Sequence, residues 1–159
     1  DPVLSRGLGD VYKRQEDAKQ AGRRILLAGV FGGRLSEGID YHNGILDAVA
    51  CIGIPNPPPS IHQKALRTYI EERFGRANAW RYASTQPAIN AILQAMGRPI
   101  RSITDRALIL LLDKRNTDRT YIECYPNDIR MNTTTEPETT KSFARRFFSR
   151  VHRQSEGSS

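Results

Sequence analysis

The sequence has few of the residues that would support a membrane, disulfide or metal-based class of protein. No apolar run approaches the ~20 residues that a membrane-spanning helix requires, and no secretory signal peptide is visible. Two cysteines, Cys51 and Cys124, are too few for a disulfide framework or a four-cysteine metal site, which favours a reducing compartment. The histidines are too scattered to suggest a metal site. We therefore expect no membrane association, no bound metal and a cytoplasmic location, nucleoid-associated if the source is prokaryotic.

Sequence signatures for holding a nucleotide are also missing. The chain has no G-x-x-x-x-G-K-[ST] loop and no D-E-x-H box, so we expect that it cannot hold Mg-ATP by itself. A plain nucleotide-binding α/β enzyme would need a glycine-rich turn of the G-x-G-x-x-G type, and none is present.

What the chain does have is an excess of positive charge. It carries 24 Lys and Arg against 17 Asp and Glu, a formal net charge of +7 and a pI near 9.8. A basic balance favours polyanionic partners, although charge describes steering and solubility rather than fold. With 159 residues, the chain is long enough for one domain with a hydrophobic core.

Residues 1–15 are expected to be foreign to the protein. Residues 5–15 read S-R-G-L-G-D-V-Y-K-R-Q and resemble the translation of a transposon-based sequencing adaptor. The terminal bases of that adaptor, GAT GTG TAT AAG AGA CAG, encode Asp10 through Gln15 in frame. An ordinary basic tail is the alternative interpretation. If the adaptor interpretation holds, the native sequence enters near Glu16, within a longer gene.

Apolar runs alternate with helix-forming stretches in the remainder of the chain. Unbroken short apolar runs are typical of strands buried on both faces of a parallel sheet. A helix is expected from Ser60, which caps it, to about Phe74, with Gly75 ending it. The further expected elements are strands at 25–31, 48–54 and 107–112, a helix at 87–96, an edge element at 121–125, a linker at 131–140 and a basic amphipathic helix at 141–152. This alternation predicts an α/β fold with a parallel sheet flanked by helices.

Two arginines follow the second of these helices. Arg98 and Arg101 lie three residues apart, Gln94 precedes them, and Gly97 and Pro99 end the helix. Guanidinium groups stay charged and present a fork of donors that suits phosphate oxygens. Alternatively, both arginines simply solvate the C-terminal end of the helix, where positive charge is favourable.

A polar, glycine-flanked loop follows the apolar run at residues 25–31. It contains Ser36, Glu37, Gly38 and Asp40. Open α/β sheets place ligand contacts in loops that leave a strand end, and Gly38 permits close approach of the backbone to a phosphate. The alternative is a strand-to-helix turn whose two carboxylates serve only to begin a helix.

These two segments resemble motifs V and VI of superfamily 2 helicases, in the form used by the iron–sulfur helicases of the XPD/Rad3/DinG family. Residues 33–40 read G-R-L-S-E-G-I-D (motif V), and residues 94–101 read Q-A-M-G-R-P-I-R (motif VI). Residues 53–55, G-I-P before a proline-rich loop, and residues 79–83, A-W-R-Y-A, also resemble family segments. The resemblance spans residues 24–115 in the expected order.

The resemblance implies a RecA-like fold and the role of the C-terminal motor domain of an ATP-dependent 5′→3′ DNA helicase, in repair or replication-linked work. In the family, motif VI supplies arginine fingers to ATP bound on the other RecA-like domain, which implies catalytic roles for Gln94, Arg98 and Arg101. The implied nucleotide-binding residues are Gly38, Asp40, Arg98 and Arg101. The implied contacts with single-stranded DNA are Ser36, Glu37 and Gly38.

The other parts of such a helicase are expected outside this chain. ATP and Mg²⁺ would be bound mainly by a first RecA-like domain, the cysteines of a 4Fe–4S cluster would also lie upstream, and this piece alone would be inactive. The chain then divides into residues 1–15, residues 16–130 as a partial RecA-like domain, and residues 131–159 as linker, basic helix and polar tail. A stand-alone nucleic-acid-binding module and the helicase half of a nuclease–helicase stay open as alternatives.

Overall fold

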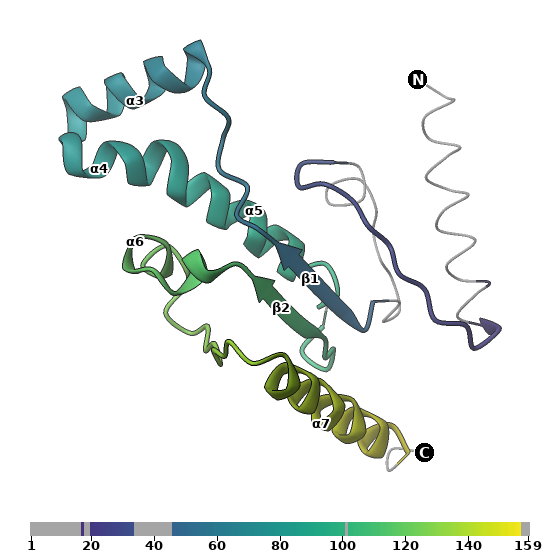
Figure 1. The fold of residues 1–159 in the computed structure, drawn as a ribbon. Coiled ribbons are helices and arrows are strands. Elements are labelled where there is room, and N and C mark those ends of the chain that lie inside the picture. The colour runs from purple at the N-terminus through teal and green to yellow at the C-terminus, as the bar shows by residue number, and fades with distance from the viewer. Residues whose placement is uncertain (1–16, 18–19, 34–45, 101, 157–159) are drawn as a thin grey trace.

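The computed structural model describes residues 17, 20–33, 46–100 and 102–156, with side chains described as far as residue 151 (Figure 1). The described elements in chain order are β1 (Ala48–Ile52), α3 (Ile61–Phe74), α4 (Arg76–Trp80), a π-helical turn (Arg81–Thr85), α5 (Gln86–Met96), β2 (Leu108–Leu112), a 3-10 turn (Lys114–Thr117), α6 (Arg119–Ile122) and α7 (Pro137–Glu156).

The two strands form a parallel pair. Ala48 lies opposite Leu108, and the register continues to Ile52 opposite Leu112. The chain passes from β1 to β2 through α3, α4, the π-helical turn and α5, because parallel neighbours need a long crossover connection. In Figure 1, α5 crosses close to β1, which it contacts, and α7 lies beyond β2. The predicted α/β class with a parallel sheet is confirmed.

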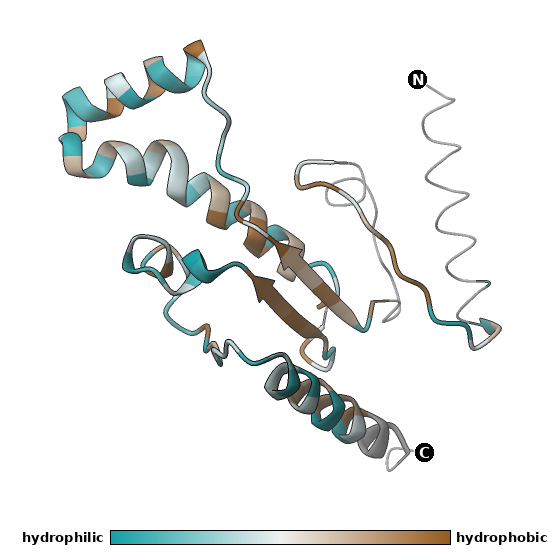
Figure 2. Ribbon diagram, in the orientation of Figure 1, coloured by the Kyte–Doolittle hydropathy of each residue, from teal (hydrophilic) through white to brown (hydrophobic). Residues whose placement is uncertain are grey.

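α5 supplies the centre of the hydrophobic core. Ile89 and Ile92 are both fully buried, and they pack with Cys51 of β1 and with Ile54 just after it. Tyr121, Cys124 and Tyr125 close the cluster from the side of α6. Figure 2 shows both strands and the second half of α5 in brown, the colour of apolar residues. This packing confirms the helix predicted at residues 87–96.

α3 has the ends that the sequence predicts. The Ser60 hydroxyl accepts a hydrogen bond from Gln63 N at 3.0 Å, which satisfies one of the free backbone donors of the first turn. Gly75 has φ 83, a left-handed conformation that favours glycine and stops the helix. Ile70 is the only buried residue of α3. The ends of α3 are therefore set more by its capping residues than by core packing.

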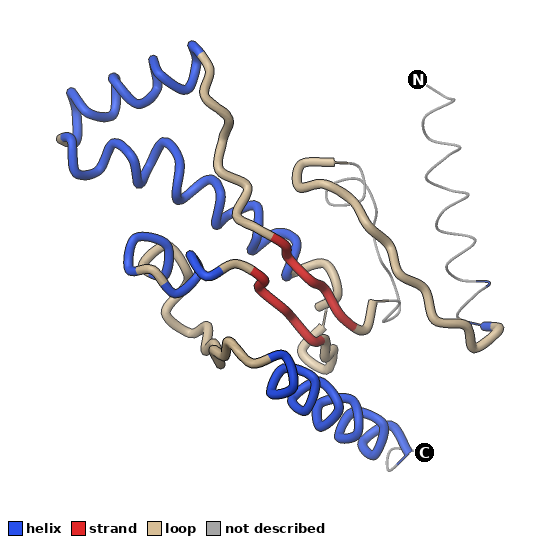
Figure 3. Tube along the Cα trace, viewed as in Figure 1, coloured by secondary structure: helices blue, strands red, loops and turns tan. Residues whose placement is uncertain are grey.

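The predicted strand at residues 25–31 is wrong. Residues 23–30 have no regular secondary structure, as the loop colour in Figure 3 shows, and Leu26 and Val30 are 94% and 75% exposed. A strand needs a neighbour to pair its backbone groups, and within the described ranges β1 pairs only with β2. Phe31 nevertheless packs against the core. An apolar run alone does not specify the neighbour that would make it a strand.

β1 is buried on one face rather than on both. Cys51 is 2% exposed and its neighbour Ile52 is 76% exposed, because successive side chains of a strand point to opposite faces. Among the described residues, α5 covers the buried face and nothing comparable covers the other.

The C-terminal part of the chain is more helical than expected. The edge element predicted at 121–125 is wrong, because its first residues belong to α6, where Arg119 pairs with Glu123 at 2.7 Å across one helical turn. The predicted basic helix is confirmed, but it begins earlier, at Pro137, since proline suits a first helical turn. The linker expected at 131–140 is correspondingly shorter. In the described part of the chain, no helix is both long and apolar enough to cross a membrane.

Candidate functional site

Two of the predicted catalytic residues lie on the last turn of α5 and just after it. Ile89 and Ile92 anchor one face of the helix in the core. Gln94 is exposed on the last turn, and Arg98, half-buried, comes two residues after the helix ends at Met96. From there the chain runs toward the amino end of β2 (Figure 1). Core packing therefore fixes the place at which both side chains reach the surface.

Gln94 and Arg98 line one surface hollow. Its volume is about 290 Å³, and Leu93 and Gly97 complete the lining. Gly97 N donates to Leu93 O at 3.0 Å, and Arg98 N donates to Ala95 O at 3.2 Å, so the turn after the helix is held by backbone bonds. The structure thus brings an amide and a guanidinium group to the same hollow.

Gly97 lines this hollow, but its backbone conformation does not require glycine. Its φ of −75° is available to any residue. A Cβ at this position would lie 3.5 Å from Leu93 O and 3.7 Å from Gln94 O, which are ordinary contact distances. A side chain would therefore fit sterically but would occupy space beside Arg98.

The other predicted site residues lie outside the described residues. They are Ser36, Glu37, Gly38, Asp40 and Arg101. The structure therefore neither joins them to Gln94 and Arg98 nor separates them, and their roles stay predictions.

The turn that enters motif V is described, and it depends on two glycines. Gly32 has φ 72, in the left-handed region. Gly33 N donates to Val30 O at 3.0 Å, and a Cβ on Gly33 would lie 2.9 Å from that same oxygen. The glycine pair therefore ends the apolar run for a steric reason.

A charged pair that the sequence reasoning missed lies at the carboxyl end of β2. Arg115 donates to Asp113 from Nη2 at 2.7 Å and from Nε at 3.0 Å. These hydrogen bonds are the main reason that the pKa of Asp113 is lowered and the pKa of Arg115 is raised. The guanidinium carbon also lies 6.0 Å from the centre of the Tyr121 ring. The spacing Asp-x-Arg directly after a predicted strand is the signal that could have revealed this pair.

A buried polar network continues from this pair into the core. Tyr125 Oη donates to Asn116 Oδ1 at 2.7 Å, and Asn116 Nδ2 donates to Asp113 O at 2.9 Å. Burial raises the pKa of Tyr125 to about 12, so its hydroxyl keeps the proton that it donates. Asn56 Nδ2 donates to Tyr121 Oη at 3.0 Å. These bonds tie the segments that leave β1 and β2 to each other.

The two cysteines are part of the core. Cys51 and Cys124 are 2% and 6% exposed. Burial raises the pKa of the Cys51 thiol, which disfavours the thiolate that binds metals. Cys124 Sγ donates a hydrogen bond to Thr120 O at 3.6 Å. Within the ranges that the structure describes, no three His, Cys, Asp or Glu side chains gather as metal ligands.

The family model for a helicase C-terminal domain matches residues 6–132 of this chain. The match includes both strands, α5 and the segments that resemble motifs V and VI. It begins inside the stretch that resembles an adaptor, and the assignment of residues 1–15 stays a prediction.

The chain is also similar to individual ATP-dependent DNA helicases. It is 33% identical over 126 residues to ATP-dependent DNA helicase XPD of Sulfolobus acidocaldarius, which covers 72% of this chain and 23% of that protein. It is 31% identical over 136 residues to ATP-dependent DNA helicase chl1 of Schizosaccharomyces pombe, which covers 80% of this chain and 16% of that protein. The chain thus spans less than a quarter of the length of either relative. With motif VI at the end of a packed α5, these matches confirm the resemblance: the chain belongs to the helicase C-terminal domain family, as a member of its XPD/Rad3/DinG group.

Proposed function

We propose that this chain is the second motor domain of an ATP-dependent 5′→3′ DNA helicase, and that it completes ATP hydrolysis on a first RecA-like domain. The observation that carries the proposal is the hollow shared by Gln94 and Arg98, within the region that matches helicases. Arg101 supplies a second guanidinium group from the same motif. ATP and Mg²⁺ are held mainly by the first domain, and this domain contributes the edge that meets the phosphates.

The groups in motif VI fit phosphoryl transfer. Negative charge in the transition state is spread over the oxygens of the transferred phosphoryl group. A guanidinium group placed against that charge can contribute ~10³–10⁵ in rate. Arg98 and Arg101 take this role, and Gln94 contacts the γ-phosphate or orients the attacking water. A charged group helps the reaction only when it is held in the right place. The packing of α5 in the core supports such a fixed position for Gln94 and Arg98.

Motif V takes the DNA-binding role in this proposal. The Ser36 hydroxyl and the backbone at Glu37 and Gly38 contact a phosphate of single-stranded DNA. Asp40 orients the motif VI arginines or the nucleotide sugar. The tight turn at Gly33, directly before motif V continues, has no room for a side chain.

The chain by itself is expected not to hydrolyse ATP, because its sequence has neither a G-x-x-x-x-G-K-[ST] loop nor a D-E-x-H box. A 4Fe–4S cluster, which the family resemblance implies, does not fit the two buried cysteines of this chain, so its ligands would come from elsewhere. The proposed partners are the first RecA-like domain and single-stranded DNA, in the cytoplasm or on the nucleoid.

The test is Arg98→Ala, and separately Arg101→Ala, in the full-length protein that contains this domain. Each substitution is expected to abolish unwinding and to lower DNA-stimulated ATP hydrolysis by ~10³ or more, while single-strand affinity stays within a few-fold. Arg76→Ala is the matched control, because its side chain is 90% exposed and lies 4.0 Å from its partner Glu71. Loss of DNA affinity in the motif VI variants would show that the arginines bind the strand and not the nucleotide.

Motif V has a separate test. Ser36→Ala is expected to weaken the stimulation of ATP hydrolysis by DNA while leaving unstimulated hydrolysis unchanged. Stimulation equal to that of the unsubstituted protein would remove Ser36 from the strand-binding residues.

A further inference from the structure

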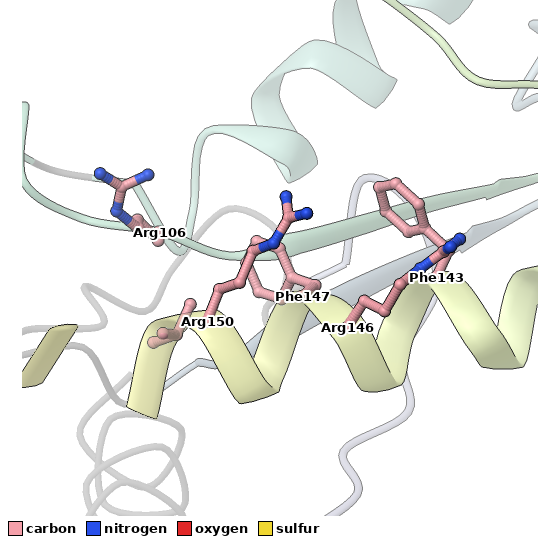
Figure 4. Close-up of a pocket in the computed structure, with 6 residues that line it drawn as sticks. Arg106, Phe143, Arg146, Phe147 and Arg150 are labelled. Atoms are coloured by element: carbon pink, nitrogen blue, oxygen red, sulfur yellow. The ribbon is translucent and has the colours of Figure 1, made fainter. Parts of the chain in front are cut away.

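A second hollow is lined mostly by α7, which follows the part of the chain that matches helicases. It is formed by α7 and by the segment that leads into β2, and its volume is about 410 Å³. Figure 4 shows that the labelled side chains of α7 project toward the side on which β2 lies. The lining residues are Arg106, Phe143, Arg146, Phe147, Arg150 and Val151. α7 begins at Pro137, after the family match ends at residue 132, whereas Arg106 lies within the matched region.

The hollow is strongly positive. Arg106, Arg146 and Arg150 are exposed, and none of them forms an ion pair or hydrogen bond with a carboxylate among the described residues. Glu138, the acidic residue of the first turn of α7, is instead paired with Lys141 at 3.3 Å. Three permanently charged groups at one hollow without internal compensation favour an anionic ligand with several charges.

Aromatic rings lie between these charges. Phe143 is 40% exposed, and it lies one turn before Phe147, which also lines the hollow. The Phe147 ring is held edge-on against Phe148, with ring centres 5.2 Å apart. A free phosphate or a duplex backbone would use the arginines but leave the Phe143 ring without a partner.

We propose that this hollow binds single-stranded nucleic acid, with phosphates on Arg106, Arg146 and Arg150 and a base stacked on Phe143. An unpaired strand offers both a row of phosphates and open base faces, which is the combination that these side chains match. The inference names a further strand contact, and it rests on α7 and Arg106 rather than on the proposed roles of motifs V and VI.

The test measures binding of this chain to a fluorescent oligothymidylate by anisotropy at several salt concentrations. The variant Arg146→Ala/Arg150→Ala is expected to bind about tenfold or more weakly, with the slope of log K against log salt reduced by about 1.4, since each phosphate contact on a single strand contributes ~0.7. Lys141→Ala/Arg145→Ala is the matched control, because it removes the same charge from α7 at residues that do not line the hollow. Equal losses in both variants would overturn the proposal.

The stacking contact is tested with Phe143→Ala. We expect affinity to fall about fivefold or more with little change in the salt slope, because stacking is largely independent of counterions. Thermal unfolding recorded by circular dichroism shows whether the variant keeps its fold. Unchanged affinity for Phe143→Ala, or equally tight binding of a duplex of the same length, would overturn the assignment to a single strand. This assay contains no ATP, so its failure would leave the proposed role of Arg98 in ATP hydrolysis untouched.

Discussion

An arginine follows α5 and others lie within α7, but the two helices differ in how firmly the core holds them. α5 has its Ile89 and Ile92 fully buried, and Arg98 follows directly from that anchored helix. α7 has no buried residue among those whose side chains are described, and its Arg146 and Arg150 are exposed. Chemistry on a phosphate requires a guanidinium group held in one place, whereas strand binding by charge tolerates movement. The comparison agrees with the proposed catalytic role at the end of α5 and with the proposed additional strand binding at α7.

The difference between α5 and α7 is tested most directly by truncating one apolar side chain in each helix. Ile92→Ala is expected to lower the free energy of unfolding by ~2–5 kcal/mol, because it leaves a cavity beside Cys51 and Ile89. Phe143→Ala in α7 is expected to cost less than ~1 kcal/mol, because that ring is already 40% exposed. Urea denaturation of the chain measures both. Similar losses from the two substitutions would mean that α7 is part of the core and that the contrast is false.

A smaller loss of stability is expected from disrupting the polar network of Tyr125, Asn116 and Asp113. Tyr125→Phe removes the hydrogen bond to Asn116 Oδ1, which is itself buried, and should cost ~1–3 kcal/mol by leaving that oxygen without a partner. Lys141→Ala is the counterpart in α7, where an exposed pair with Glu138 is expected to contribute less than ~0.5 kcal/mol. The measurement is again urea denaturation, at pH 7. No loss in Tyr125→Phe would show that the network does not stabilise the fold.

The smallest expected effect depends on pH and concerns Asp113. Its pKa is lowered in the folded state, chiefly by the hydrogen bonds from Arg115, so the pair contributes stability that is fully present above the unfolded pKa of ~3.9. That contribution is lost as the pH falls through the lowered folded pKa. Asp113→Asn should therefore be less stable than the unsubstituted chain at pH 6, and the difference should shrink below pH ~4. The denaturation midpoints of both proteins, measured from pH 6 to pH 2, check this expectation. A difference that stays constant over that range would contradict it.

Sequence reasoning succeeded where a residue acts on its immediate neighbours. Ser60 and Gly75 predicted both ends of α3, because a hydroxyl cap and a left-handed glycine are local devices. The helix predicted at residues 87–96 is also found, and the burial of Ile89 and Ile92 in α5 follows the helical period. The motif VI residues were identified by their resemblance to a family motif, and Gln94 and Arg98 line one hollow in the structure.

Sequence reasoning failed where a segment's structure depends on contacts with residues distant in the sequence. Residues 25–31 have the composition of a strand, but among the described residues no strand pairs with them. The hollow at α7 could not be predicted, because Arg106 comes from the segment before β2 and the other lining residues come from α7. The pairing of Asp113 with Arg115 needed only short-range reasoning, and its spacing was overlooked.

The most direct test of the central claim is kcat for ATP hydrolysis by Arg98→Ala in the full-length protein, at saturating ATP and saturating single-stranded DNA. Saturation with both ligands separates turnover from binding, and Arg76→Ala, exposed on the surface, serves as the control. If Arg98 supplies a guanidinium group to the transition state, kcat falls by ~10³ or more while the control is unaffected. A kcat within a few-fold of the unsubstituted protein would contradict the claim and remove Arg98 from the hydrolytic site.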